Sequence, residues 1–233
     1  MTNFNIMAAH VAISKLREQE RQKYDNSYFS EHYWREDLEG HTGNRGLSYD
    51  DPEHRERFSY LYELLVEQNN PKQLLDAGCG PGYLLEHALL DGISARGVDC
   101  SASAREQFLA RTKGNWATAF HIGSICSMPF PDRSFDLLLC LDVLEHLIVF
   151  DIFVAANELS RLASKDLICS INLDNPYFFH PTIISRESWT ALFESTGFVR
   201  QNMARTDALN RAARRRYSEY DFFVFERLAV SQS

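Results

Sequence analysis

The sequence predicts an α/β fold in which a seven-stranded, mostly parallel sheet with an antiparallel last strand carries a helical N-terminal cap. Two observations lead to this prediction. From residue 73 onward, short apolar runs alternate with stretches of helical periodicity, as they do in sheets built from right-handed strand-helix-strand units. The first apolar run also ends in a loop with three alternating glycines, residues 78–82, and a helical pattern follows at once.

The chain of 233 residues is long enough for one domain with a large core and too short for two independent catalytic domains. Its 45% hydrophobic and 24% charged residues match an ordinary globular protein, so disorder is not expected. We therefore divide the chain into an N-terminal cap or lid, residues 1–70, and a core, residues 71–233, with one active site.

The predicted cap combines two helices with an irregular stretch between them. A weak helical pattern covers residues 6–24, and a second helix over residues 52–67 carries apolar side chains at helical spacing. The stretch between them holds three glycines and follows neither periodicity. It is rich in aromatic residues, among them Tyr24, Tyr28, Phe29, Tyr33 and Trp34.

The core pattern gives seven strands with helices between them. A serine before the last helix and a glycine at its end mark its two boundaries. The two final strands are expected to pair antiparallel. We expect strands at residues 73–78, 95–100, 117–123, 134–142, 166–172, 198–204 and 218–228, and helices at residues 81–92, 101–114, 149–162 and 185–198.

Charge and cysteine usage limit the partners. The formal net charge of −8 argues against a broad nucleic-acid surface, because such binding depends on neutralising phosphates with Lys and Arg. The five cysteines form no CxxC pair and no even framework, which is typical of reduced cytosolic thiols. The N-terminus lacks the layout of a signal peptide, and no apolar run is long enough to span a bilayer. We expect a cytoplasmic location and no membrane partner.

The glycine loop indicates a ligand with positive charge. Glycines at 78, 80 and 82 allow a tight turn and a close approach of backbone to ligand, and the following helix presents free N–H groups. A dinucleotide fingerprint has its third glycine three positions after the second, whereas Tyr83 stands there. Asp76, two residues before the loop, would repel a pyrophosphate and attract an ammonium or sulfonium cation.

Further along the chain, Asp99 ends the next strand, where a carboxylate is suited to hold both hydroxyls of a ribose. The loop after the third strand would then flank an adenine with Ser124 and Ile125. Serine accepts a hydrogen bond more weakly than a carboxylate does. Together these residues describe a site for a cationic nucleoside.

The segment from Leu74 to Leu147 resembles the class I S-adenosylmethionine-dependent methyltransferases, most closely their small-molecule, methyltransferase type 11-like branch, which includes ubiquinone and menaquinone biosynthesis enzymes. The matching pieces are "LLDAGCGPG", "GVD", "MPFPDRSFDLLLCLDVLEHL" and the later "LFESTGF". Ser124 departs from the acidic residue that the family often has near the adenine. The resemblance implies a Rossmann-like sheet, S-adenosylmethionine as methyl donor and S-adenosylhomocysteine as product. It implies cofactor contacts from Asp76, Gly78, Cys79, Gly80, Gly82, Asp99, Cys100, Ser124, Ile125, Leu141 and Asp142.

The acceptor side is less defined by sequence. The resemblance implies an oxygen or nitrogen acceptor on a small molecule such as a secondary metabolite, a sugar or a quinone-like compound. Aromatic residues in the cap are typical of lids in this family, and an ordinary cap core is the other interpretation. The loop over residues 174–189 offers Tyr177, Phe178 and Phe179 as an acceptor pocket or as an apolar loop pinned to the core.

Glu145 and His146 are the candidate catalytic pair. A helix that begins at the end of the fourth core strand would place Asp142 on one face with both of them. His146, with an ordinary pKa near neutrality, is the candidate base for an acceptor that must lose a proton. The plain alternative is a first-turn carboxylate beside a histidine that packs near the cofactor.

A metal site is a further alternative. Asp142, Glu145, His146 and His180 resemble the Glu-x-x-Glu-His motif and later His of the small-RNA 3′-terminal 2′-O-methyltransferases. Asp142 replaces the first Glu and a second late His is missing, so we expect no metal. The other competing functions are a nicotinamide-dependent oxidoreductase, which Asp76 and the glycine spacing oppose, and a non-catalytic cofactor-binding partner. The basic cluster Arg211–Arg216 would bind an acidic acceptor or form a solvated helix face.

Overall fold

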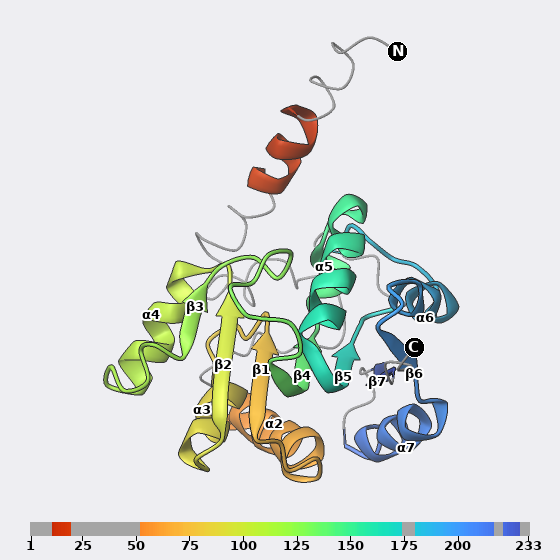
Figure 1. The fold of residues 1–233 in the computed structure, drawn as a ribbon. Helices are drawn as coiled ribbons and strands as arrows, with labels where there is room; N and C mark the ends of the chain where they lie inside the picture. Colours follow the sequence, from red (N-terminus) through yellow and green to blue (C-terminus); the bar gives the residue numbers. More distant parts are fainter. Residues whose placement is uncertain (1–10, 20–51, 174–179, 217–220, 229–233) are drawn as a thin grey trace.

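The computed structural model describes residues 11–19, 52–173, 180–216 and 221–228. Its centre is a seven-stranded sheet with the strand order β3-β2-β1-β4-β5-β7-β6 (Figure 1). Strand β7 is antiparallel to both β5 and β6, and the other neighbouring pairs are parallel. The predicted fold class is therefore confirmed, including the antiparallel last strand. The strands are β1 Gln73–Ala77, β2 Ser94–Asp99, β3 Phe120–Ile122, β4 Phe135–Leu141, β5 Ala163–Ser170, β6 Val199–Gln201 and β7 Phe222–Arg227.

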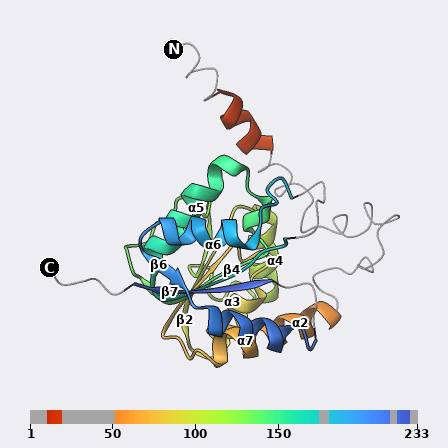
Figure 2. The same cartoon turned by 90° about the vertical axis from the view of Figure 1, so that its right-hand side faces the viewer.

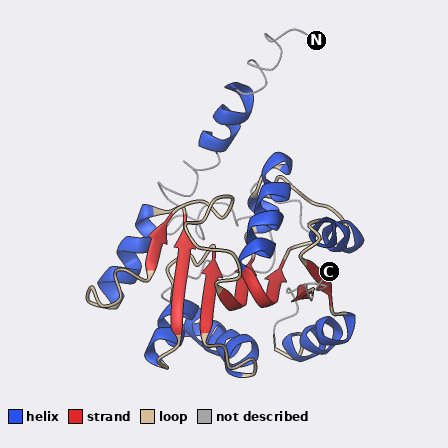
Figure 3. Ribbon diagram, in the orientation of Figure 1, coloured by secondary structure: helices blue, strands red, loops and turns tan. Residues whose placement is uncertain are grey.

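Helices cover both faces of the sheet (Figures 2 and 3). This explains why the central strands read as nearly continuous apolar runs, since both of their faces are buried. Residues 11–19 form a short N-terminal helix. The other helices are α2 Pro52–Tyr62, which continues into the π-helical turn Glu63–Glu67, α3 Tyr83–Leu90, α4 Ala102–Arg111, α5 Val149–Leu162, α6 Arg186–Ser195 and α7 Met203–Ala213.

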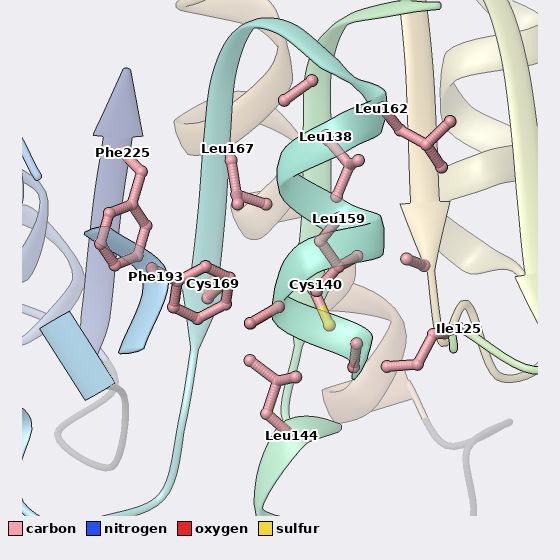
Figure 4. Close-up of a cluster of buried hydrophobic side chains, with 14 of the residues drawn as sticks. Ile125, Leu138, Cys140, Leu144, Leu159, Leu162, Leu167, Cys169, Phe193 and Phe225 are labelled. Carbon is pink, nitrogen blue, oxygen red and sulfur yellow. The ribbon is translucent and has the colours of Figure 1, made fainter. Parts of the chain in front are cut away.

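Two hydrophobic clusters lie on opposite faces of the sheet. In the first, α5 and α6 pack on the central strands, with Leu159 and Phe193 against Leu138, Leu167 and Phe225 (Figure 4). The second cluster joins α2, the π-helical turn, α3, α4 and α7 to the other face of the same strands. Because successive side chains along a strand point to opposite faces, the central strands contribute residues to both clusters. The sheet therefore supports the loops that leave its edges.

Several predicted boundaries differ from the structure. Strands β3 and β5 begin three residues away from their predicted starts, at Phe120 and Ala163. The strand expected over residues 198–204 ends at Gln201, and α7 begins at Met203 with the side chain of Asn202 accepting a hydrogen bond from the N–H of Arg205 (3.0 Å).

The segment after β4 does not begin an α-helix at Asp142, as expected for the candidate catalytic pair. It forms one 3₁₀ turn, Leu144–His146, and Leu147 and Ile148 are extended. Helix α5, Val149–Leu162, matches the helix predicted over residues 149–162.

The predicted cap is described in part. Helix α2 and the π-helical turn bury Leu61, Leu65 and Val66 in the same cluster as Leu74 of β1. The N-terminal helix extends beyond the edge of the sheet to which β1 and β2 point (Figure 1). The aromatic residues Tyr24 to Trp34 of the predicted lid, and Tyr177 to Phe179 of the predicted pocket, lie outside the described residues. No helix in the described ranges is long and apolar enough to cross a membrane.

Candidate functional site

The glycine loop connects β1 to α3 at the carboxyl edge of the sheet. Gly78, Gly80 and Gly82 all have positive φ angles, of 79°, 50° and 74°. The N–H of Gly78 donates to the carbonyl of Val98 (2.7 Å), which fixes the loop against β2. Gly82 is the N-cap of α3, and its carbonyl accepts the first helical bond from Glu86 (2.9 Å). The loop therefore brings backbone N–H groups and a helix start to one edge, as anion- and nucleotide-binding loops do.

Glycine is required at two of these positions by space as well as by φ. A Cβ at Gly78 would lie 2.3 Å from Cγ2 of Val143, in the segment that follows β4. A Cβ at Gly82 would lie 2.7 Å from the ring of Phe108 in α4. The loop thus packs against two other segments of the chain, and its shape depends on having no side chain there.

Asp76 and Asp99 are two buried carboxylates that lie beside this loop. Asp76 is 4% exposed and Asp99 7% exposed. Burial, together with the charge of Asp99, raises the pKa of Asp76 to about 7. Asp99 accepts hydrogen bonds from the N–H groups of Gly80 (2.8 Å) and Ser101 (2.9 Å). The two acids make this edge of the sheet strongly attractive to a cation.

The other predicted cofactor residues have varied surroundings. Ser124 is exposed, and its hydroxyl accepts from the N–H of Cys126 (3.1 Å). Ile125 is buried and belongs to the first hydrophobic cluster (Figure 4). Cys79 and Cys100 are half-buried free thiols, and burial raises the pKa of Cys79 well above its usual value. Cys79 is therefore protonated near neutral pH, in agreement with a packing role. All five cysteines of the chain are free.

The end of β4 is held in an uncommon conformation. Asp142 has a φ of 53°, which is rare for a residue with a side chain. Its N–H donates to the hydroxyl and to the carbonyl oxygen of Ser170, each at 3.0 Å. The Ser170 hydroxyl donates back to the Asp142 carboxylate (2.7 Å). This reciprocal contact, for which no local sequence signal exists, ties the ends of β4 and β5 together. Leu141, the residue before Asp142, is half-buried.

Glu145 is buried between the segments that follow β4 and β5. Its side chain is 1% exposed, and Oε1 accepts a hydrogen bond from the N–H of Asn172 (2.9 Å). The other oxygen, Oε2, is buried and has no hydrogen-bond partner among the residues that the structure describes. Burial, reinforced by the charge of Asp142, raises the pKa of Glu145 to about 8. The Glu145 carboxyl is thus held against the backbone of the segment that follows β5, and it lies in the first turn of the 3₁₀ element.

His146 lies against His180. Their ring centroids are 4.6 Å apart with an interplanar angle of 74°. One ligand atom from each of Glu145, His146 and His180 lies within 4.8 Å of the other two. Of the four residues considered for a metal, the structure thus gathers three. Asp142 acts on Glu145 through its charge but is not part of this group.

The basic cluster is partly neutralised by acids of the chain. Arg214 pairs with Asp221 (3.1 Å), and Arg216 pairs with Glu56 and lies over the ring of Tyr60. All four of its arginines, Arg211, Arg214, Arg215 and Arg216, are exposed. These contacts are those of a solvated helix face, which was one of the two interpretations of this cluster.

Comparison with known proteins finds a matching family model and several relatives. The family model described as a methyltransferase domain matches residues 75–170. The norajmaline N-methyltransferase of Rauvolfia serpentina is 30% identical over 112 residues, which are 46% of this chain and 37% of that protein. The chain therefore spans well under half the length of this curated relative.

Solved structures share the fold across most of the chain. The PH0226 protein from Pyrococcus horikoshii OT3 superposes with a TM-score of 0.60 at 16% identity, covering 77% of this chain and 93% of that one. The N-methyltransferase NodS from Bradyrhizobium japonicum WM9, solved with S-adenosyl-L-homocysteine, gives a TM-score of 0.56 at 18% identity, covering 77% and 90%.

Proposed function

Since the chain carries a class I S-adenosylmethionine-dependent methyltransferase domain, we propose that it transfers a methyl group from S-adenosylmethionine to an oxygen or nitrogen atom of a small molecule. The acceptor class is a secondary metabolite, a sugar or a quinone-like compound, in keeping with the small molecules that relatives such as the norajmaline N-methyltransferase are named for. With five free cysteines, a cytoplasmic location is part of this proposal.

The pair of buried carboxylates beside the glycine loop carries the proposal. Asp76 is buried with a raised pKa, and a sulfonium or ammonium group nearby would offset the cost of burying its charge. Asp99 is held by hydrogen bonds from the N–H groups of Gly80 and Ser101, and a carboxylate is an acceptor suited to the hydroxyls of a ribose. A dinucleotide would instead bring a pyrophosphate to the same two negative charges.

Gly78, Gly80 and Gly82 would receive the amino-acid end of the cofactor, with Cys79 and Cys100 contributing backbone. Ser124 and Ile125 would flank the adenine, and Leu141 and Asp142 would face the reacting end. The bound cofactor supplies an electrophilic methyl group, so the protein needs mainly to align the acceptor and to exclude water. Residues 1–70 are proposed as the cap that helps to exclude it.

His146 is proposed as the group that handles the acceptor's proton. A hydroxyl acceptor loses a proton on methylation, whereas an amine that arrives neutral does not need a base in the transfer step. His146 is buried at the end of β4, on the β5 side of the glycine loop. Its imidazole acts as the base when its lone pair is not engaged by a metal. Glu145 positions it by fixing the turn that carries both residues.

Calorimetric titration of the full chain tests the proposal. We expect S-adenosylmethionine and S-adenosylhomocysteine to bind at one site per chain, while NAD gives no heat. NAD binding without an S-adenosylmethionine signal would favour the oxidoreductase and overturn the proposal. If the cofactor binds and is never consumed with any of a panel of phenol, amine and sugar acceptors, the non-catalytic partner becomes the better interpretation.

A further inference from the structure

Three metal-ligating side chains from two separate segments meet beside the end of β4. Glu145 and His146 belong to the 3₁₀ turn Leu144–His146, and His180 belongs to the segment between β5 and α6. One donor atom from each lies within 4.8 Å of the other two. A single ion at the centre of such a group needs only small side-chain rotations to reach bonds of about 2.0–2.2 Å.

Side-chain packing alone does not account for the buried Oε2 atom of Glu145. Two histidines can pack edge to face without a ligand, as these rings do. A buried carboxyl oxygen without a partner, however, costs free energy. Within the described part of the chain, Oε2 of Glu145 has no hydrogen-bond partner, while Oε1 accepts from the N–H of Asn172. A cation would remove this cost.

Both segments are fixed by the backbone before any ligand arrives. The N–H of Thr182 donates to the carbonyl of Glu145 (3.3 Å), and its hydroxyl donates to the carbonyl of Leu147 (2.6 Å). These bonds hold the segment of His180 against the turn that carries the other two side chains. The group is therefore positioned by the fold and does not depend on a chance contact of surface residues.

The donor types select the ion. We propose that Glu145, His146 and His180 bind one divalent transition-metal ion, from the series that runs from Mn²⁺ to Zn²⁺. Two imidazole nitrogens and one carboxylate suit these ions, whereas Mg²⁺ and Ca²⁺ prefer oxygen ligands. Three protein ligands also leave coordination positions open, which is the arrangement of a metal that receives a further ligand. The negative charge of Asp142, which acts on Glu145, adds to the attraction.

The ion would lie at the same edge of the sheet as the proposed cofactor site, toward β5. A metal bound there could receive an oxygen of the acceptor, and a His146 that ligates it would no longer be available as a base. The site itself does not depend on the proposed methyl transfer, so binding of metal and binding of cofactor can be tested separately.

Metal titration of the chelator-treated full chain tests this inference. We expect Zn²⁺ to bind at one ion per chain by calorimetry and Co²⁺ to give a visible absorption spectrum of nitrogen and oxygen ligation, while Mg²⁺ binds far more weakly. His180→Ala and Glu145→Gln should each weaken Zn²⁺ binding by at least about tenfold, since losing even an indirect partner of a metal ligand costs that much. Glu145→Gln keeps an oxygen for the Asn172 N–H and therefore keeps the turn.

His121→Gln is the matched control. His121 is also a partly buried histidine, and its Nε2 has no hydrogen-bond partner in the described ranges, but its ring packs against Phe130, outside the group. It should bind Zn²⁺ like the unchanged chain. Zn²⁺ affinity that is the same in all three variants, or no binding at one ion per chain, would overturn the site. An S-adenosylmethionine titration on the same samples separates failure of the metal site from failure of the proposed function. If the unchanged chain does not bind the cofactor, the proposed function is refuted and the Zn²⁺ result is unaffected.

Discussion

Asp99 and Gly80 are joined by a hydrogen bond of 2.8 Å from the N–H of the glycine to Oδ2 of the carboxylate. Through this bond, the carboxylate at the end of β2 is oriented by the loop at the end of β1. The same carboxylate accepts from the N–H of Ser101 through its other oxygen (2.9 Å). Asp99, the proposed ribose-binding residue, and the glycine loop are therefore coupled, and a change in either alters the other.

Asp99→Ala should weaken S-adenosylmethionine binding by roughly ten- to hundredfold, since hydrogen bonds to a charged group contribute about 1.5–3 kcal/mol. The loss has two parts, the missing contact to the ribose and the released orientation of Gly80. Calorimetric titration of the variant measures it.

Asp136→Ala is the control for this change. Asp136 also accepts two backbone N–H groups, from Lys72 (2.9 Å) and Gln73 (2.8 Å), but at the opposite end of β1. It should lower the stability without changing cofactor affinity. Equal cofactor affinity in Asp99→Ala and the unchanged chain would refute the ribose role.

Gly78→Ala should destabilise the fold more than Gly92→Ala does. Both glycines have positive φ, 79° and 77°, so both variants bear the cost of a left-handed residue, about 1–2 kcal/mol. Only at Gly78 does a Cβ meet another group, Val143 at 2.3 Å, while nothing lies within 4 Å at Gly92. Overpacking adds about 1–3 kcal/mol to the loss in unfolding free energy. Urea unfolding of both variants measures the difference. Equal losses of unfolding free energy would mean that the segment of Val143 moves to make room for the new Cβ at little cost.

Most of the fold was predictable because its signals are local. The strands β1, β4 and β5 are apolar runs buried on both faces, and Ser185 before α6 is a serine cap whose side chain accepts from Ser188 (3.2 Å). Helix α7 was missed because its segment is polar and buries few residues, Thr206, Asn210 and Ala213. The asparagine cap before it, Asn202, was the available signal.

The site was predictable where a motif fixes it and not where contacts are long-range. Asp76, the glycines and Asp99 follow from strand ends and turn chemistry. The bracing of Glu145 by Asn172, and the pairing of Asp142 with Ser170, join residues far apart in sequence. The left-handed Asp142 also prevented the helix expected to start there, because its φ of 53° breaks the helical path.

The ligand-free chain should lose stability as the pH rises from about 5 toward about 7. Burial and the charge of Asp99 raise the pKa of Asp76 to about 7 in the folded protein. In the unfolded chain it titrates near about 4. Between these values the folded state holds a proton that the unfolded state has lost, so the unfolding free energy falls with rising pH.

Asp76→Asn should reduce this slope, since an amide does not titrate. Glu145, whose pKa is raised to about 8, contributes a slope of the same sign that persists in this variant and extends to higher pH. Urea unfolding in buffers across this range gives the comparison. A slope that Asp76→Asn does not alter would show that Asp76 is ionised in the folded protein at acidic pH, and would remove one argument for a cationic ligand.

Arg17→Ala should release the N-terminal helix from α5 with little effect on global stability. The guanidinium of Arg17 pairs with both carboxylate oxygens of Asp151 in the first turn of α5, with Nε at 2.9 and 3.0 Å. Asp151 is buried, whereas half of the Arg17 side chain is exposed. Because half of the Arg17 side chain is exposed, solvent screens the pair and can reach Asp151 once the guanidinium is removed, so the unfolding free energy should fall by only about 1 kcal/mol. Amide hydrogen exchange over residues 11–19 should rise, because a short helix is not stable without tertiary contacts. Lys15→Ala on the same helix should leave that exchange unchanged, and equal exchange in both variants would mean that other contacts hold the helix in place.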